Sequence, residues 1–436
     1  YCASVTGGGM TAILFKIPGV PSSAPTTYDG YPMAQRGEAG KALGVQLICS
    51  AIGGVFAAIC MLLLSPQLTQ AALSFGPSEL FAISFMGLSI LTSLETDNIC
   101  RTIISGLIGL LLACIGLDPL LGVPRLTFGT RFLTSGIEMI PVMIGFFAVT
   151  EVLKQTNKPA KLQAVGDSKK SVSAKMPSIK ELLSVKWIIA RCSVLGTVVG
   201  ILPGAGATIA SFLCYSTEQK LSKHPEKFGT GCIDGIAAPE VGNNAATGGS
   251  MVPLLSLGIP GGNAAAIMMS ALVLKGVTMG PLLLVNQPQF LAATFSSMMV
   301  ANIIMVFAAI VIAKIFVQIL KVPYSILGPT IIMMATIGAY ATKNTAVDVI
   351  LMAISGLIGF VFVTCKFNSS AMILGLVLGV ICESNLRRAY TIAAGNSLWE
   401  ETVNILSRPV TGIILIICLV VLLNPVVKPL IRKKKS

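Results

Sequence analysis

Two apolar stretches of this sequence are each interrupted by a Pro-Gly pair, and hydroxyl-bearing residues and glycines precede the pair in both. They span residues 6–19 and 247–261, each ends on its Pro-Gly pair, and they align with one inserted residue. Proline lacks an amide hydrogen and glycine adopts backbone angles that other residues avoid, so a helix ends there and leaves backbone groups unpaired. Lipid cannot satisfy such groups, which are tolerated only inside protein or around a wet cavity. Matched breaks in two parts of a chain therefore predict a binding site for a transported solute.

The chemistry around the breaks suits an anion. Residues 196–208 form a further broken motif, in which glycines precede a helix whose first amides point outward at its positive end. Hydroxyl groups cluster just after the first break, and could hydrogen-bond carboxylates. The candidate substrate-binding residues are Pro18, Gly19, Ser22, Ser23, Thr26, Thr27, Gly204, Gly206, Thr208, Pro260, Gly261 and Asn263. Two alternatives stay open: Gly196 and Gly200 also fit a tight helix-packing face, and Asn263 also fits a helix cap.

A carboxylate, two amides and two hydroxyls lie together in residues 238–250. A central acidic residue in a membrane helix costs about 2.5–3.5 kcal/mol, so Glu240 needs a partner, a proton, a cation or a place at the interface. Hard oxygen ligands suit a sodium ion. The candidate coupling-ion residues are Asp29, Glu240, Asn243, Asn244 and Thr247. The alternative is a helix cap and loop at the water interface, which Pro239 and the Asn pair favour, and Asp29-Gly30 also fits a turn.

Lys16 is an unusual charge in an apolar run, two residues before the first Pro-Gly pair. Its long side chain could extend outward to water or meet a carboxylate of the substrate. We favour the first of these interpretations.

The elements that carry these residues belong to an integral membrane protein. The sequence is 54% hydrophobic and only 11% charged, too few charges to cover a soluble particle of 436 residues. At about 20 residues per crossing, its apolar runs suggest roughly ten helical elements, several too short or too broken to span. The net charge of +13 is concentrated in residues 154–191 and in the tail at 428–435. Both segments are expected in the cytoplasm.

The fold predicted is an all-α polytopic membrane protein of two repeat-related halves with Pro-Gly-broken helices. Residues 1–153 would be the remainder of the first repeat, 154–186 a cytoplasmic basic linker, and 187–436 the second repeat with a C-terminal helix and basic tail. The motif at 196–208 has no counterpart in the first half. Because the chain starts at Tyr1, we expect that counterpart to lie upstream of the sequence given.

Several chemistries lack their motifs in this sequence. It contains no Gly-x-x-x-x-Gly-Lys-Ser/Thr loop, no His-Glu-x-x-His and no Gly-x-Ser-x-Gly, and its single histidine, His224, lies in a charged loop. We therefore expect no enzyme, no cofactor and no metal apart from a coupling Na+, with transport driven by an ion gradient. A passive anion channel is the alternative. An intramembrane enzyme using Glu240 and Asp29 as a carboxylate pair has no supporting motif.

With these residues in view, the chain resembles the TctA-type large permease subunit of the tripartite tricarboxylate transporters. The resemblance runs almost end to end. It is carried by residues 17–19, 29–43, 122–129, 136–153, 200–206, 238–245, 257–261, 374–379, 383–388 and 408–409. Lys16 and the pair after Glu240, Val241-Gly242, depart from the family pattern, which weakens the assignment of citrate in particular.

The resemblance implies a symporter of the bacterial inner membrane, driven by sodium or protons, for tricarboxylates or related organic acids. It also implies two partners, a small membrane subunit of the TctB type and a periplasmic solute-binding protein of the TctC type. No nucleic acid partner is expected, because the positive charge is explained by membrane topology.

Overall fold

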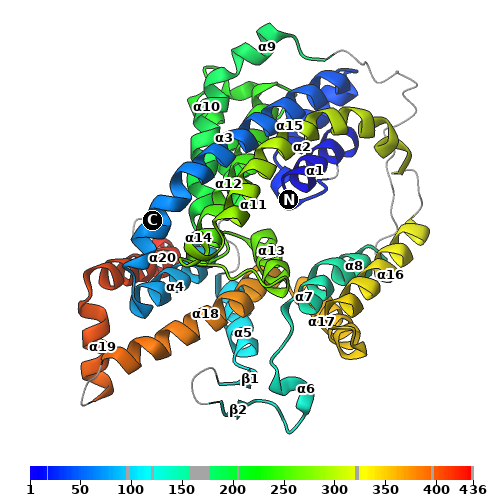
Figure 1. The fold of residues 1–436 in the computed structure, drawn as a ribbon. Coiled ribbons are helices and arrows are strands. Elements are labelled where there is room, and N and C mark those ends of the chain that lie inside the picture. Colours follow the sequence, from blue (N-terminus) through cyan, green and yellow to red (C-terminus); the bar gives the residue numbers. More distant parts are fainter. Residues whose placement is uncertain are drawn as a thin grey trace. The chain divides into compact units, whose positions relative to one another are not determined.

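The chain is helical over nearly all of the part described by the structure, a computed structural model (Figure 1). The described residues are 1–16, 18–94, 99–118, 122–156, 176–203, 206–319, 324–393 and 397–433. Within them, two short strands, β1 (Gly116–Leu117) and β2 (Pro124–Arg125), form one antiparallel pair in which Gly116 lies opposite Arg125. The predicted all-α class is therefore confirmed.

Five helices in the described ranges are long and apolar enough to cross a membrane, and a bent pair of helices would make a sixth span. The five are α3 (Ala39–Leu73), α15 (Pro288–Ile319), α16 (Tyr324–Lys343), α17 (Ala346–Thr364) and α18 (Ser369–Ala393). The bent pair is α19 (Leu398–Ser407) and α20 (Pro409–Lys433), which meet at 94°. Shorter apolar helices are α1 (Cys2–Phe15), α5 (Ile99–Ala113) and α13 (Asn263–Leu274). This is a multi-pass membrane protein with several half-length helices, as the broken apolar runs predict.

The chain forms two compact units, and each takes segments from both sides of the basic linker. The first unit comprises residues 1–70, 161–262 and 279–321, and the second comprises 71–160, 263–278 and 322–436. These units are defined by spatial contact, so they differ from the two halves at 1–153 and 187–436. The repeat relation between those halves stays a prediction, and most of the linker, residues 157–175, lies outside the described part.

A buried helix, α12, is the centre of the first unit. The unit contains α1, η1 (Pro21–Ser23), α2 (Thr26–Gln35), α3, α9 (Ile179–Ser184), α10 (Lys186–Ile201), α11 (Gly206–Leu221), η3 (Pro225–Lys227), α12 (Asp234–Leu257), α14 (Leu283–Asn286) and α15. Every residue of α12 from Gly235 to Ser256 is buried. Small side chains allow this: a Cβ added at Gly200 of α10 would lie 2.5 Å from the carbonyl oxygen of Ala246. The packing role considered for Gly196 and Gly200 is therefore present in the structure.

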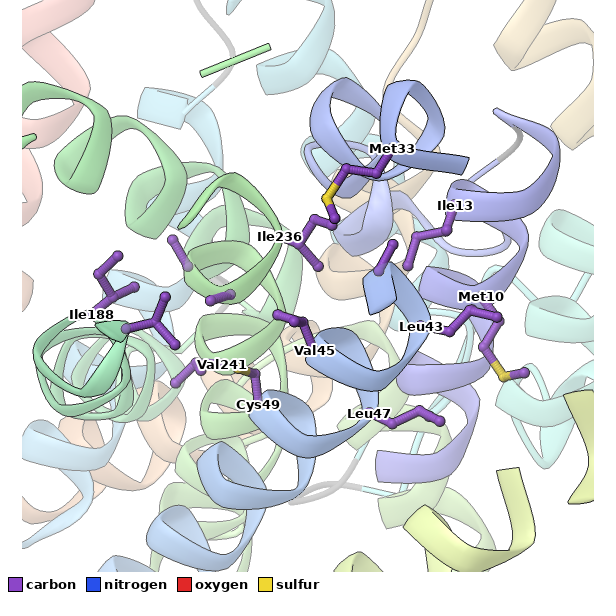
Figure 2. Close-up of a cluster of buried hydrophobic side chains, with 14 of the residues drawn as sticks. Met10, Ile13, Met33, Leu43, Val45, Leu47, Cys49, Ile188, Ile236 and Val241 are labelled. Carbon is purple, nitrogen blue, oxygen red and sulfur yellow. The ribbon is translucent and has the colours of Figure 1, made fainter. Parts of the chain in front are cut away.

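Apolar side chains on both faces of α3 form the core of the first unit (Figure 2). Leu43 and Leu47 lie towards Met10 of α1, whereas Val45 and Cys49 lie towards α12. A helix that packs on two sides is held in one rotational position. That position decides which neighbours the few polar residues of α3 meet.

The second unit is built around α18 and its glycine contacts. It contains α4 (Pro77–Leu94), α5, β1, β2, α6 (Arg131–Thr134), α7 (Met139–Ile144), the π-helical segment η2 (Gly145–Val149), α8 (Thr150–Thr156), α13 and α16 to α20. A Cβ at Gly109 of α5 would overlap the backbone of α18 at Met372. At the hairpin, Arg125 pairs with Glu383 of α18 through two hydrogen bonds.

Candidate functional site

The first Pro-Gly break turns the chain back along α1. Helix α1 ends at Phe15, and Lys16 adopts a left-handed conformation with φ 57°. The amide of Gly19 then donates a hydrogen bond of 3.2 Å to the carbonyl of Gly8. A Cβ at Gly19 would lie 2.8 Å from the Cα of Gly8, so this close approach requires glycine on both sides. The apolar run is therefore a helix followed by a fold-back, and not one continuous helix.

The second break folds back in the same manner onto α12. This helix ends at Leu257, and Gly258 adopts φ 72°. A Cβ at Gly261 would lie 2.5 Å from the Cβ of Ser250 and 2.7 Å from the carbonyl oxygen of Gly200. The second apolar run is thus also a helix followed by a tightly packed return.

The two fold-backs meet equivalent parts of the aligned stretches. In the alignment, Ser250 corresponds to Gly9, which directly follows Gly8 in α1. Gly19 contacts Gly8, and Gly261 contacts Ser250. Each Pro-Gly pair therefore packs against the Thr-Gly-Gly segment of the helix that precedes it, defined as residues 6–9 in α1 and 247–250 in α12.

The helices that carry the two aligned stretches, α1 and α12, contact each other in the first unit and run in opposite directions. The Cys2 sulfur is 3.1 Å from the hydroxyl of Thr247, and the Thr6 hydroxyl donates a hydrogen bond of 3.2 Å to the side-chain oxygen of Asn244. As the residue number rises along α1, it falls along α12. The two helices therefore run antiparallel, with residues 2–6 of α1 beside residues 244–247 of α12.

Helix α11 touches both breaks. The amide of Gly206 donates a hydrogen bond of 3.1 Å to the carbonyl of Gly261, and the Ser211 hydroxyl donates one of 2.5 Å to the carbonyl of Ser22. These two α11 residues are about 7.5 Å apart along the helix axis, at about 1.5 Å per residue. The structure thus brings the regions of both breaks against one helix.

The structure places the predicted substrate residues around the two breaks, at the start of α13, and, for one of them, outside the described residues. Most of them lie in the first unit around the two breaks, and the assignment of substrate binding to them stays a prediction. Pro18 and Gly19 are exposed, Gly206 and Thr208 are half-buried, and the buried members are Ser22, Ser23, Thr26, Thr27, Pro260 and Gly261. Asn263 begins α13 in the second unit, and Gly204 lies outside the described residues.

Glu240 is fully buried in α12, and its carboxylate accepts three side-chain hydrogen bonds. The Thr26 hydroxyl donates to Oε1 at 2.6 Å, and the Ser50 hydroxyl donates to Oε2 at 2.9 Å. The Gln46 amide nitrogen donates to Oε2 at 3.2 Å and to the carbonyl of Thr6 at 2.8 Å. Its oxygen, Oε1, is buried and has no hydrogen-bond partner among the described residues. The site therefore holds a carboxylate, two hydroxyls and one unused amide oxygen, all oxygen ligands of the kind that sodium accepts.

The rest of residues 238–250 continues as helix. Thr247 donates a hydrogen bond of 2.7 Å to the carbonyl of Asn244, and the Asn244 side chain donates one of 2.8 Å to the Asn243 oxygen. The alternative of a loop at the water interface is wrong, because Pro239 and both asparagines lie inside the buried α12. Packing against small residues on neighbouring helices overrides the local turn preference of these residues.

Gln46 and Ser50 are site residues that the sequence reasoning missed. They lie four residues apart on α3, so they share one helix face, and both are fully buried. A polar pair at this spacing in a long apolar helix is a signal that could have drawn attention to them.

Asp29 belongs to a different hydrogen-bond group from Glu240. Its buried carboxylate accepts bonds from the amides of Gly229, Gly231 and Cys232 at 2.8–3.0 Å, and from the Tyr215 hydroxyl at 2.9 Å. These donors fix the loop that leads into α12. The structure thus gives Asp29 an anchoring role, and its proposed part in ion coupling stays untested.

Comparison with known proteins identifies the family to which this chain belongs. The profile of the "Tripartite tricarboxylate transporter TctA family" matches residues 1–374. The chain belongs to this family. As a TctA-family protein with several apolar spans, it is a multi-pass membrane protein of a transport system.

Two relatives of this TctA-family chain come from Agrobacterium vitis, and both are described as uncharacterized. The "Uncharacterized 52.8 kDa protein in TAR-I ttuC' 3'region" is 35% identical over 434 residues, which is 98% of this chain and 84% of the relative. The "Uncharacterized protein in TAR-II ttuC' 3'region" is 37% identical over 241 residues, 55% of this chain and 97% of the relative. No solved structure matches the chain.

Proposed function

We propose that this chain is the large permease subunit of an ion-gradient-driven uptake system for tricarboxylates or related organic acids. It would work in the bacterial inner membrane with a small TctB-type membrane subunit and a TctC-type periplasmic binding protein that delivers the substrate. Membership of the TctA family supports the transport class. The coupling ion, the partners and the site are the parts that this proposal adds.

The single observation that carries the proposal is the antiparallel crossing of α1 and α12 beside two folded-back Pro-Gly segments. Helices related by an inverted repeat would meet in this way, with equivalent segments side by side. Next to α11, the carbonyls of Gly261 and Ser22 accept hydrogen bonds from Gly206 and Ser211, so a carboxylate anion would use other amides and hydroxyls beside the two breaks as donors.

The buried Glu240 group is the proposed site of the coupling ion. A sodium ion would use the carboxylate, the Gln46 oxygen and the hydroxyls of Thr26 and Ser50, which can turn their lone pairs inward. A proton would instead neutralise the carboxylate. Either ion removes a negative charge from the interior, so occupancy would favour the movement that alternates access.

Uptake of labelled tricarboxylates and related organic acids, citrate among them, into proteoliposomes containing all three subunits tests the proposal. An imposed inward Na+ or H+ gradient should raise the initial rate at least tenfold over vesicles without a gradient. Equal rates with and without both gradients would refute coupling, and single-channel currents far above carrier turnover would identify a channel instead.

A matched pair of variants tests the role of Glu240. Glu240→Gln keeps the shape of the side chain but removes its charge, so it should lower gradient-driven uptake about tenfold or more, the loss expected for one ionic ligand. Glu226→Gln, in an exposed loop, should leave uptake unchanged. Full uptake with Glu240→Gln would remove this residue from the coupling site.

A further inference from the structure

A polar cleft of about 690 Å³ opens on the first unit beside the first break. Its volume lies within the range of about 300–1,000 Å³ that is usual for small-molecule sites. The polar side chains that line it come from the end of α1, from α2 and from α11. They are Lys16, Thr27, Tyr28, Tyr31, Gln35, Tyr215 and Gln219.

Lys16 is the residue that gives this cleft its charge. It holds a left-handed backbone conformation, with φ 57° and ψ 24°, which non-glycine residues seldom adopt. Its ammonium group lies 5.6 Å from the centre of the Tyr31 ring, a cation–π distance. In the described part of the chain it makes no ion pair with a carboxylate. A lysine held over an aromatic ring without a carboxylate partner keeps its charge available to an anion.

The nearest buried carboxylate, Asp29, is sealed behind the wall of the cleft. Tyr215 and Gly229 line the cleft, and both donate hydrogen bonds to Asp29 from the other side. Two further amides use its remaining acceptor positions. The residues that line the cleft therefore offer the Lys16 ammonium group, the phenols of Tyr28 and Tyr31, and the side-chain amides of Gln35 and Gln219, a set that suits a small carboxylate.

The cleft lies at the end of the first unit to which the basic linker connects. Gln35 ends α2, shortly before α3 begins, and near that start Lys41 pairs with Glu181 of α9 at 2.9 Å. Helix α9 lies within the linker, near its end at residue 186. An excess of Lys and Arg in a connecting segment favours the cytoplasmic side, so this end of the unit is assigned to the cytoplasm.

We propose that this cleft is the cytoplasmic vestibule through which the carboxylate leaves, and that Lys16 binds the departing anion there. The inference rests on the proposed function for its direction of transport. It adds an anion contact in the cleft beside the first break, and it gives Lys16 a role that the outward-pointing interpretation does not.

Labelling of the wild-type full-length chain in nanodiscs tests binding without any substitution. Citrate is the probe, and a water-soluble amine-acylating reagent reports the accessibility of each lysine by mass spectrometry. Citrate should slow acylation of Lys16 at least fivefold and leave the exposed Lys223 unaffected. Sulfate at the same ionic strength should protect Lys16 much less. No protection, or equal protection by sulfate, would overturn the proposal.

Transport kinetics test the role in release. Lys16→Gln should raise the KM for citrate applied from the cytoplasmic face about tenfold, as expected for the loss of one charge-assisted contact. The KM at the opposite face should change less than twofold, and Lys16→Arg should restore most of the affinity. The control Lys223→Gln should change neither KM.

The two proposals fail separately in these experiments. Unchanged KM values with Lys16→Gln, in vesicles whose uptake still follows an ion gradient, would overturn the vestibule and leave the proposed function intact. If citrate protects Lys16 but uptake is the same with and without both gradients, the proposed coupling is wrong and the anion site at Lys16 stands.

Discussion

A methyl group added at Gly200 should separate the two central helices of the first unit. An alanine Cβ at this position would lie 2.5 Å from the carbonyl oxygen of Ala246, 2.7 Å from its Cα and 3.0 Å from its carbonyl carbon. All three are backbone atoms, so no flexible side chain can move aside. The helices α10 and α12 would have to part by several tenths of an ångström along their contact.

The cost of Gly200→Ala follows from this overlap. Overpacking a tight interface costs about 1–3 kcal/mol, which exceeds the ~1 kcal/mol that alanine gains over glycine in a helix. The same shift would disturb the second break, because the Gly200 carbonyl also packs against Gly261. We therefore expect lower thermal stability together with slower uptake.

Thermal unfolding of the purified protein, with Gly7→Ala as the matched control, measures this effect. Gly7 also lies in a helix, but a Cβ there would meet no atom within 4 Å. Gly200→Ala should lower the Tm by several degrees, whereas Gly7→Ala should leave it unchanged or raise it. If both variants melt at or above the wild-type temperature, the inferred contact between α10 and α12 is wrong.

Three further outcomes follow from polar contacts. Asp29→Asn places a side-chain NH2 group against backbone N–H donors, so it should destabilise the protein by about 1–3 kcal/mol. Faster proteolysis of the loop before α12 would measure this loss, and uptake by the folded fraction should persist. Arg191→Met leaves the buried carboxylate of Glu218 without its bidentate partner and should lower the Tm. The double variant Arg191→Met/Glu218→Met removes the unpaired charge and should recover much of the lost Tm; no recovery would contradict the pairing. Hydrogen bonds from Lys41 and Ser178 lower the pKa of Glu181 to about 2, so the stabilisation by this carboxylate is complete above its ordinary pKa near 4.5 and is lost as the pH falls towards 2. Glu181→Gln should flatten that part of the stability profile, and an unchanged profile would contradict the assignment.

The sequence could predict the local features because they depend on residues near one another in the chain. A Pro-Gly pair placed just after an apolar helix favours a helix end, so the breaks after α1 and α12 follow from the sequence, although single prolines such as Pro66 in α3 lie inside helices. The cost of burying a carboxylate likewise marks Glu240 as a residue that needs partners. The local turn preference of Pro239 and the two asparagines was misleading, because these residues lie inside a buried helix that is stabilised by tertiary packing.

The tertiary structure alone decides which distant residues meet. Asp29 is held by backbone amides some 200 positions away, and Glu240 by Gln46 and Ser50 on a helix that reads as a plain membrane span. Composition determines that this chain enters a membrane, and the Pro-Gly pairs determine where its helices stop. The pairing of α1 with α12 and the separation of Asp29 from Glu240 depend on how several helices pack together, because close packing selects one rotational position for each helix and sequence spacing does not encode that choice.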